Sequence, residues 1–142
     1  MSMNNLENPK ILAAFEEISF PELDMMNITA KIDTGAYSGA IHCTKIHETK
    51  EDGQKVLYFS PFDNPELIKK TTHYNKRTVR SSNGTSQKRY FIDTSVIIKG
   101  ITYPIHISLA DRSDMRWPVL IGRRFLKNNE FLVDVRRHSH VS

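Results

Sequence analysis

The chain has 142 residues and a mass of 16.4 kDa, which is the size of one domain with its own hydrophobic core. Apolar residues make up 39% and charged residues 25%, so a wholly disordered chain is excluded, and no apolar run is long enough to cross a membrane as a helix. The net charge of +4 is uneven: residues 67–92 hold seven basic and no acidic side chains, which predicts either a solvated basic face or an attraction for an acidic partner.

The chain order predicts one folded domain over residues 11–137, between a flexible arm at residues 1–10 and a short tail at residues 138–142. The start of the chain lacks the basic and then apolar pattern of a secretory signal. Cys43 is the only cysteine, so no disulfide can form within the chain. A single cysteine is typical of a reducing compartment, which predicts a cytoplasmic protein.

Extended segments dominate the first half of the domain. The Asp52-Gly53 pair predicts a tight hairpin turn, and residues 61–70, which contain two prolines, predict a loop with one helical turn at most. Alternating or β-branched apolar residues predict strands over residues 11–20, 28–32, 40–46 and 55–60.

The second half continues this pattern and adds one helix. Asn83-Gly84 and Lys99-Gly100 predict hairpin turns, since both pairs favour positive φ. Strands are expected over residues 77–80, 88–98, 101–109, 119–121 and 131–135, and a short helix over residues 123–128. Many short strands with regularly spaced turns indicate an all-β barrel or sandwich.

The first motif with chemical potential is Asp33-Thr34-Gly35-Ala36, which directly follows the apolar Ile32. Glycine lets the backbone approach a neighbour closely, and a threonine hydroxyl can bond back to the backbone and fix the turn. The motif therefore presents a carboxylate at the end of a strand. A purely structural turn around Asp33 is the alternative interpretation.

The second motif is the apolar run 119–121 followed by Gly122 and Arg123. Together with the Asp33 motif and the intervening hairpin around Asn83-Gly84, it resembles the retropepsin-like aspartic protease fold, in which a glycine-tipped flap lies between the two motifs. Residues 31–36, 79–84 and 111–126 resemble a bacterial family named for an ATP-dependent zinc protease, which often accompanies ATP-grasp ligases that add glutamates to proteins.

This resemblance implies a closed all-β barrel of six or seven strands, one short helix near the C-terminus, and a homodimer. Asp33 would be the catalytic carboxylate, since the chemistry needs two carboxylates that share one proton and each chain supplies one. Arg123 would pair with Asp111, Asp114 or Asp134, or would hold a substrate carboxylate. The resemblance assigns Thr34, Gly35 and Ala36 to the active-site loop, Ser81, Ser82, Asn83 and Gly84 to the flap, and Gly122 and Arg123 to the brace of the site.

The resemblance and the basic segment together suggest an endopeptidase that trims acidic or glutamylated peptides, with an ATP-grasp ligase as a second partner. Arginine forms strong paired bonds with carboxylates. The candidate contacts for an acidic substrate are Arg80, Arg89, Arg112 and Arg116.

Three alternatives are open at this stage. The first is a dimeric peptide-binding module of the same fold without catalysis. The second is a nucleic-acid-binding barrel that uses Tyr74 and Tyr90 between the basic residues, which the low aromatic content of 9% disfavours.

The third alternative is a zinc hydrolase. His42 and Cys43 would point to opposite faces of one strand and could not share an ion, so neither they nor His47 predict a metal site. No phosphate-binding glycine motif is present either. We therefore expect no cofactor and no metal, a peptide or protein substrate, and no membrane partner.

Overall fold

The computed structural model describes residues 8–62, 64–80, 83–111 and 116–137, with the backbone alone at residues 79 and 80. The strands are β1 (Ile11–Leu12), β2 (Phe15–Phe20), β3 (Met25–Asp33), β4 (Ala40–Glu51), β5 (Gln54–Pro61), β6 (Lys69–Thr71), β7 (Tyr74–Arg80), β8 (Ser86–Ile98), β9 (Ile101–Ala110), β10 (Val119–Gly122) and β11 (Leu132–Val133). The described helices are a 3-10 turn over Pro21–Leu23 and α1 (Arg123–Asn128). Neither is long and apolar enough to cross a membrane.

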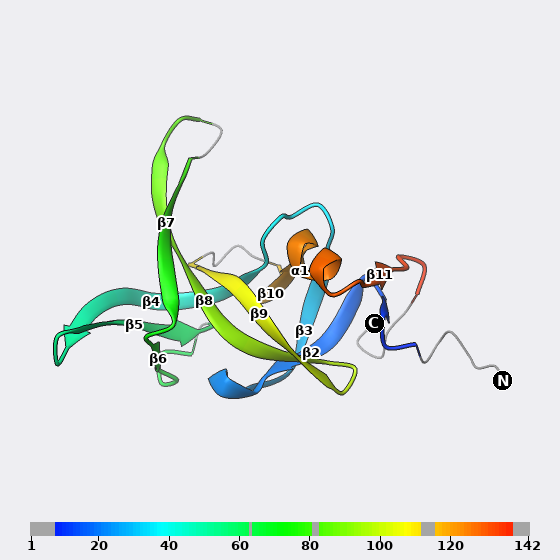
Figure 1. The fold of residues 1–142 in the computed structure, drawn as a ribbon, viewed down its shortest axis with the longest axis horizontal. Helices are drawn as coiled ribbons and strands as arrows, with labels where there is room; N and C mark the ends of the chain where they lie inside the picture. The colour runs from blue at the N-terminus through cyan, green and yellow to red at the C-terminus, as the bar shows by residue number, and fades with distance from the viewer. Residues whose placement is uncertain (1–7, 63, 81–82, 112–115, 138–142) are drawn as a thin grey trace.

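Six strands close into a barrel (Figure 1). The hydrogen-bonded order is β10, β3, β2, β8, β9 and β4, and β10 then pairs back with β4. β10 closes the ring because it pairs with two strands. It is parallel to β3 and antiparallel to β4. Closure gives each of these six strands a neighbour on both sides within the barrel. The expected all-β barrel with one short helix is therefore confirmed.

The barrel interior is filled by aliphatic and aromatic side chains from all six strands. Phe20, Ile41, Ile107 and Ile121 are among the side chains with no more than 1% exposure. Alternation along β9 puts Ile105, Ile107 and Leu109 into the same core cluster. Burial of such side chains stabilises the fold by roughly 1.5–3 kcal/mol each. This core provides the rigid support on which β3 and β10 end.

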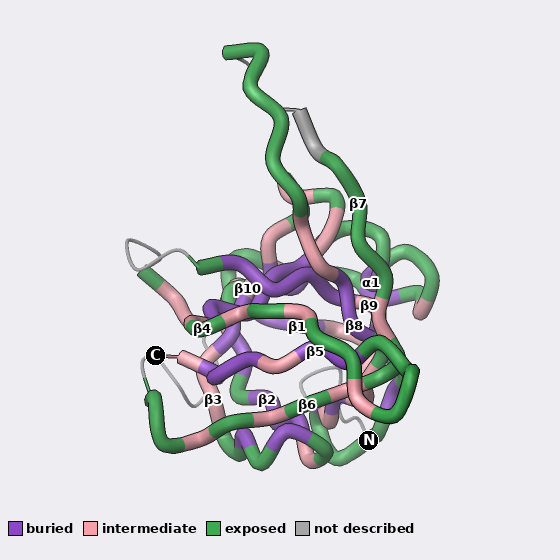
Figure 2. The backbone as a smooth tube through the Cα atoms, turned by 90° about the vertical axis from the view of Figure 1, so that its left-hand side faces the viewer, coloured by how far each residue is buried: buried purple, intermediate pink, exposed green. Residues whose placement is uncertain are grey.

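Two elements extend beyond the barrel. The outer part of β4 pairs with β5, and β5 pairs with β6, which forms a small sheet on one side. The hairpin of β7 and β8 projects from the barrel, and Figure 2 shows that its outer half is exposed. From Ser86 to Arg89, β8 pairs with β7 alone. This projecting hairpin lies where the sequence predicts a flap.

Residues 11–20 form two strands, although the sequence predicts one. The chain breaks after Leu12, where the Glu16 carboxylate accepts a hydrogen bond of 2.7 Å from the Ala13 N–H. This buried bond turns the chain, so that Ile11 and Leu12 pair with β11 and not with the barrel. The turn satisfies a backbone donor that a straight strand would have left without a partner.

Three other boundaries also differ from the prediction. Lys69 and Lys70 belong to β6, because they pair with Phe59 and Tyr58 of β5, although they were expected in a loop. β4 runs on to Glu51, and β11 contains only two residues. In each case pairing with a neighbouring strand, and not the local sequence, sets the length.

The two-residue turns at residues 52–53 and 99–100 are confirmed. Asp52 and Gly53 have φ of 52° and 81°, and Lys99 and Gly100 have φ of 52° and 79°. Among the described residues at the tip of the projecting hairpin, Gly84 is the one with a positive φ, of 89°. β7 and β8 pair Arg80 with Ser86, so their connection has five residues and is not a two-residue turn.

Candidate active site

Asp33 is the last residue of β3 and lies half-exposed on the surface of the barrel. It pairs with Gly122, the last residue of β10, so the two sequence motifs meet at the ends of adjacent parallel strands. One carboxylate oxygen accepts a hydrogen bond of 3.0 Å from the Gly35 N–H. This bond closes an Asx-type turn and orients the carboxylate.

Backbone hydrogen bonds attach the loop that follows Asp33 to the start of α1. The Ala36 N–H donates to the Asp33 carbonyl at 3.2 Å. The Arg123 N–H donates to the Ala36 carbonyl at 2.7 Å, and the Arg124 N–H donates to the Tyr37 carbonyl at 3.0 Å. The first backbone donors of a helix have no partner within the helix. Here the loop accepts them, which gives the predicted brace a physical basis.

Gly122 and Gly39 allow two segments to cross at very close range. A β-carbon on Gly122 would lie 2.6 to 2.8 Å from backbone atoms of residues 37–39. A β-carbon on Gly39 would lie 2.5 Å from the Leu120 carbonyl oxygen. Gly39 was not among the predicted site residues. The sequence gives one hint of its role: a glycine lies three residues after Ala36, at a position where no turn is expected.

The Arg123 side chain contacts the active-site loop. Its guanidinium donates to the Thr34 carbonyl at 3.1 Å and lies 5.4 Å from the centre of the Tyr37 ring. Asp134, one of the partners considered for Arg123, binds Arg136 at 3.0 Å. No bond joins Arg123 to Asp111 in the described structure, and Asp114 lies outside it.

The tip of the projecting hairpin is described from Asn83 onwards. The Asn83 side-chain oxygen accepts hydrogen bonds from the Thr85 N–H at 3.1 Å and from the Thr85 hydroxyl at 2.8 Å. This local turn leads through Gly84. Ser81 and Ser82, which were also predicted in the flap, lie outside the described residues.

The base of the hairpin carries a polar network. The Glu48 carboxylate accepts hydrogen bonds from the Tyr74 hydroxyl and, at 2.9 Å, from the Lys76 ammonium. The Tyr74 and Lys76 hydrogen bonds lower the pKa of Glu48. Burial and the bond to Glu48 raise the pKa of Tyr74 to about 12. The Tyr74 hydroxyl is thus bonded within the protein.

Acidic side chains already neutralise three of the seven basic residues between residues 67 and 92. Lys69 pairs with Asp24 at 2.8 Å, and Lys76 pairs with Glu48. Lys70 pairs more loosely, at 3.4 Å, with Glu51. This part of the basic segment is therefore a solvated face with internal partners.

The four arginines predicted to contact an acidic substrate do not form one described cluster. Arg89 is half-buried and lies opposite Arg77 in the hairpin. Arg116 is exposed, 5.9 Å from the centre of the Trp117 ring. The Arg80 side chain and the whole of Arg112 lie outside the described structure.

The histidine and cysteine residues near the site do not gather around a metal position. His42 and Cys43 are both buried on β4, and His42 Nδ1 lies 3.3 Å from the Ala110 carbonyl oxygen. Burial raises the pKa of the Cys43 thiol to about 12, so this cysteine is a neutral core side chain. Within the described ranges no three His, Cys, Asp or Glu side chains are placed to hold a metal ion.

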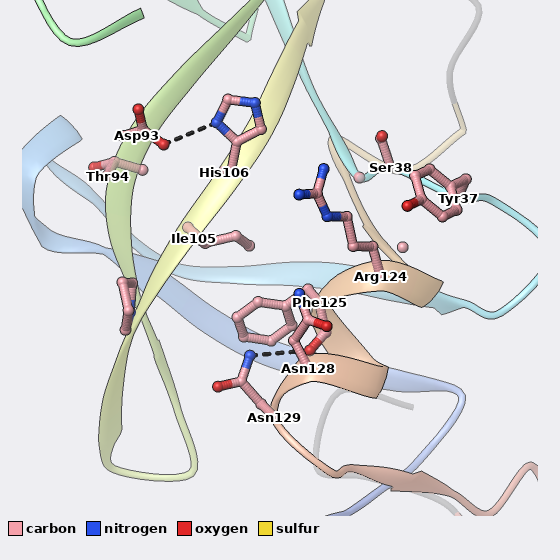
Figure 3. A pocket seen from close by; sticks show the side chains of 13 residues that line it. Tyr37, Ser38, Asp93, Thr94, Ile105, His106, Arg124, Phe125, Asn128 and Asn129 are labelled. Atoms are coloured by element: carbon pink, nitrogen blue, oxygen red, sulfur yellow. Dashed lines mark hydrogen bonds and ion pairs between the residues drawn. The ribbon is translucent and has the colours of Figure 1, made fainter.

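The structure also brings together side chains that the sequence analysis did not connect. His106 Nδ1 lies 2.8 Å from a carboxylate oxygen of Asp93, and both line a cavity beside α1 together with Arg124 (Figure 3). Asp93 and His106 are direct partners in the register of β8 and β9. The Lys99-Gly100 turn could have predicted this contact. Asp93 lies five positions before the end of β8 at Ile98, and His106 lies five positions after the start of β9 at Ile101, so the two-residue turn pairs them.

Comparisons with known proteins agree with this architecture. Residues 11–141 match the RimB-like family, described as the retropepsin-like aspartic endopeptidase RimB. A crystal structure of a Legionella pneumophila protein of unknown function superposes with a TM-score of 0.63, over 93% of this chain and 98% of that one. At 20% identity this likeness shows a shared fold.

The curated relatives are longer proteins. A probable alpha-L-glutamate ligase from Shewanella pealeana is 31% identical over 133 residues, which cover 90% of this chain and 29% of the relative. A probable alpha-L-glutamate ligase from Desulfotalea psychrophila is 31% identical over 121 residues, 80% of this chain and 26% of the relative. The chain thus spans less than a third of the length of these relatives.

Proposed function

The chain belongs to the RimB-like family of retropepsin-like aspartic endopeptidases, and from that premise we propose that it hydrolyses peptide bonds as a homodimer. The observation that carries this proposal is the placement of Asp33. Its carboxylate is half-exposed and is oriented by the Gly35 N–H. The backbone around it is held by pairing with β10 and by the bond from Arg123 to the Thr34 carbonyl. One chain supplies one such carboxylate, so the reaction requires a second copy.

In the proposed dimer the two Asp33 carboxylates share one proton, because two like charges about 3 Å apart cannot both ionise. The charged carboxylate takes a proton from water as the water oxygen attacks the peptide carbonyl carbon. The protonated carboxyl gives its proton to the carbonyl oxygen, which yields a tetrahedral diol. The carboxyl that took the water proton then gives it to the amide nitrogen, while the other carboxylate takes a proton from a diol hydroxyl. The C–N bond breaks, the two peptides leave, and one proton is again shared by the pair.

The surrounding residues have supporting roles in this proposal. Thr34 lies exposed next to Asp33, where it would face the same loop of the partner across the two-fold axis. The hairpin tip at Asn83 and Gly84 would close over the substrate and exclude water. Gly122 and Arg123 keep the loop in one conformation, which preserves the orientation of the carboxylate.

We further propose that the substrates are acidic or glutamylated peptides and that an ATP-grasp ligase is a partner. The support is the excess of basic residues in the hairpin region and the name of the relatives, probable alpha-L-glutamate ligase. The single buried thiol at Cys43 fits a cytoplasmic location. An acidic substrate predicts that added salt raises KM, since salt screens exposed charges.

The test is cleavage of a peptide pool that includes oligoglutamate-tailed members, followed by mass spectrometry from pH 4 to pH 8, with and without a chelator. Asp33→Asn should abolish cleavage in a folded protein. Asp52→Asn is the matched control, because it removes an exposed carboxylate from a turn whose positive φ asparagine tolerates. We expect chelator-insensitive cleavage by the wild type and by the control variant.

Two results would contradict the proposal. Cleavage that survives in Asp33→Asn would show that another group activates the water. Absence of cleavage by a dimeric wild type, with peptide binding retained, would support a binding module of the same fold.

A further inference from the structure

A cavity of about 360 Å³ lies beside the Asp33 loop, between β8, β9 and the start of α1 (Figure 3). One wall is formed by Tyr37, Ser38 and Gly39, which continue the loop that holds Asp33. The cavity is therefore built partly from the same loop as the candidate catalytic carboxylate, although Asp33 itself does not line it.

Three polar side chains that line this cavity have no hydrogen-bond or ion partner within the described part of the chain: Ser38, Arg124 and Asn128. Arg124 is exposed, and its backbone N–H is bonded to the Tyr37 carbonyl, which fixes where its side chain begins. Its guanidinium is thus a cation without a partner in the described part of the chain, on a side chain whose attachment point is fixed. A hydroxyl and a side-chain amide lie around the same cavity as additional hydrogen-bond donors.

The acidic side chain of the cavity is already engaged. Asp93 binds His106 at 2.8 Å, and the imidazole is stacked on the Phe91 ring at 5.3 Å between ring centres. In Figure 3 the imidazole lies between Asp93 and Arg124. Asp93 is also 64% exposed, so water screens its charge. Arg124, which is also exposed, is thus the cation of the cavity without an ion partner in the described part of the chain, whereas Asp93 already has one.

The remaining walls are apolar. Ile105 and Phe125 are both buried core residues that contribute one side to the cavity. A cation and hydrogen-bond donors beside an apolar wall suit a carboxylate on a short aliphatic arm. That chemistry is found in a glutamate side chain and in the carboxyl end of a peptide.

We propose that this cavity is a substrate subsite that binds a carboxylate of the peptide, with Arg124 forming the ion pair and Ser38 and Asn128 adding hydrogen bonds. The inference rests on the proposed peptidase function, since it assigns the cavity to the same substrate. None of these three residues belongs to the basic hairpin. The subsite therefore selects acidic peptides independently of the hairpin charges.

The test measures binding and not cleavage. Full-length Asp33→Asn protein, which would not consume the probe, is titrated against a fluorescein-labelled peptide that ends in three glutamates, and binding is read by fluorescence anisotropy. Adding Arg124→Gln should weaken binding by about tenfold, the loss expected for a charge-assisted hydrogen bond. Lys127→Gln is the matched control, because Lys127 is exposed on the same helix and does not line the cavity. It should change binding less than twofold.

Modified peptides identify the source of the carboxylate. Replacing the glutamates by glutamines tests the side chains, and amidating the C-terminus tests the terminal carboxylate. One of these changes should weaken binding as much as Arg124→Gln does, and should have little further effect in that variant. This loss of additivity would place the carboxylate at Arg124.

Several outcomes overturn the inference. These are equal losses in Arg124→Gln and Lys127→Gln, unchanged binding of both modified peptides, or no binding at all. The proposed function is judged separately by cleavage with the wild-type protein. If the wild type does not cleave the peptide while binding still depends on Arg124, the proposed function fails, and the cavity is a carboxylate site of a non-catalytic binding module.

Discussion

Replacing Gly122 by alanine tests whether the close crossing at the end of β10 holds the candidate site together. The new methyl carbon would lie 2.6 Å from the Ser38 carbonyl carbon, 2.7 Å from the Gly39 nitrogen and 2.8 Å from the Tyr37 oxygen. All three neighbours are backbone atoms, so no side chain can rotate away. Relief requires residues 37–39 to move, and these residues continue the loop that holds Asp33.

The cost of this substitution can be estimated. Gly122 has φ of −90°, which alanine adopts readily, so conformational preference alone would make the variant more stable by about 0.4–1 kcal/mol. Overpacking against a rigid neighbour costs about 1–3 kcal/mol and dominates when backbone atoms clash. Because all three neighbours are backbone atoms, we take the upper end of that cost, which leaves a net loss of about 2–2.6 kcal/mol. Since unfolding entropy is about 2.1 cal/mol/K per residue, a chain of this length should lose about 7–9 °C in Tm.

The assay is thermal unfolding followed by circular dichroism, together with amide hydrogen exchange. We expect a lower Tm and faster exchange at the Arg123 and Arg124 amides, which donate to the displaced loop. Gly53→Ala is the comparison, because its φ is 81° and no atom lies within 4 Å of the new carbon, so it reports the conformational cost alone. A Gly122→Ala protein as stable as the wild type would refute the reasoning, since the two segments would then not be held at this distance.

Three further predictions concern single side chains. Arg123→Met should lower stability by at most about 1 kcal/mol, because it removes one hydrogen bond to the Thr34 carbonyl. It should also speed amide exchange in residues 34–36, and unchanged exchange would contradict the role of Arg123 in holding this loop. Glu48→Gln should lower the urea midpoint at pH 7 and much less at pH 3. A carboxylate with a lowered pKa stabilises the fold above its ordinary value of about 4.3 and loses this effect as the pH falls through the lowered pKa, so an equal deficit at both pH values would contradict the assignment. In an ultraviolet titration, Tyr74→Phe should remove a transition near pH 12, since burial and the bond to Glu48 raise the pKa of Tyr74 to about 12. Loss of a transition near pH 10 would instead show that the Tyr74 phenol is free.

The parts of the fold that the sequence predicted are those set by local chemistry. Asp52-Gly53 and Lys99-Gly100 fix two hairpins because residues with positive φ are needed at both positions. The break after Leu12 could not be predicted, since it depends on the Glu16 carboxylate reaching the Ala13 amide. The pairing of Lys69 and Lys70 with β5 likewise depends on a strand distant in the chain.

The candidate site shows the same division. The motifs predicted that Asp33 and Gly122 would come together, and they are partners in the register of β3 and β10. The partner of Arg123 could not be predicted, because the acceptor is the Thr34 carbonyl and any residue type carries one. The need for Gly39 arises from its distance to the Leu120 oxygen, which no local pattern encodes.

Gly35, β10 and Arg123 of the same chain contact Asp33 or the loop around it, so we expect this loop to fold before the proposed dimer assembles. In each protomer Thr34 and Gly35 lie exposed on this loop, where they would contact the same loop of the second copy in the proposed dimer. This order allows a mixing experiment in which Asp33→Asn chains still pair with wild-type chains.

When equal amounts of wild-type and Asp33→Asn chains exchange fully, random pairing leaves one dimer in four with two intact carboxylates. A fixed amount of wild-type protein should therefore fall to about half of its activity. Asp52→Asn chains, mixed in the same way, should not lower it, because their Asp33 is intact. If one chain carried a complete active site, addition of Asp33→Asn protein would leave the wild-type rate unchanged. Activity that stays constant after exchange has been verified by mass spectrometry would thus rule out the shared site, whatever the oligomeric state.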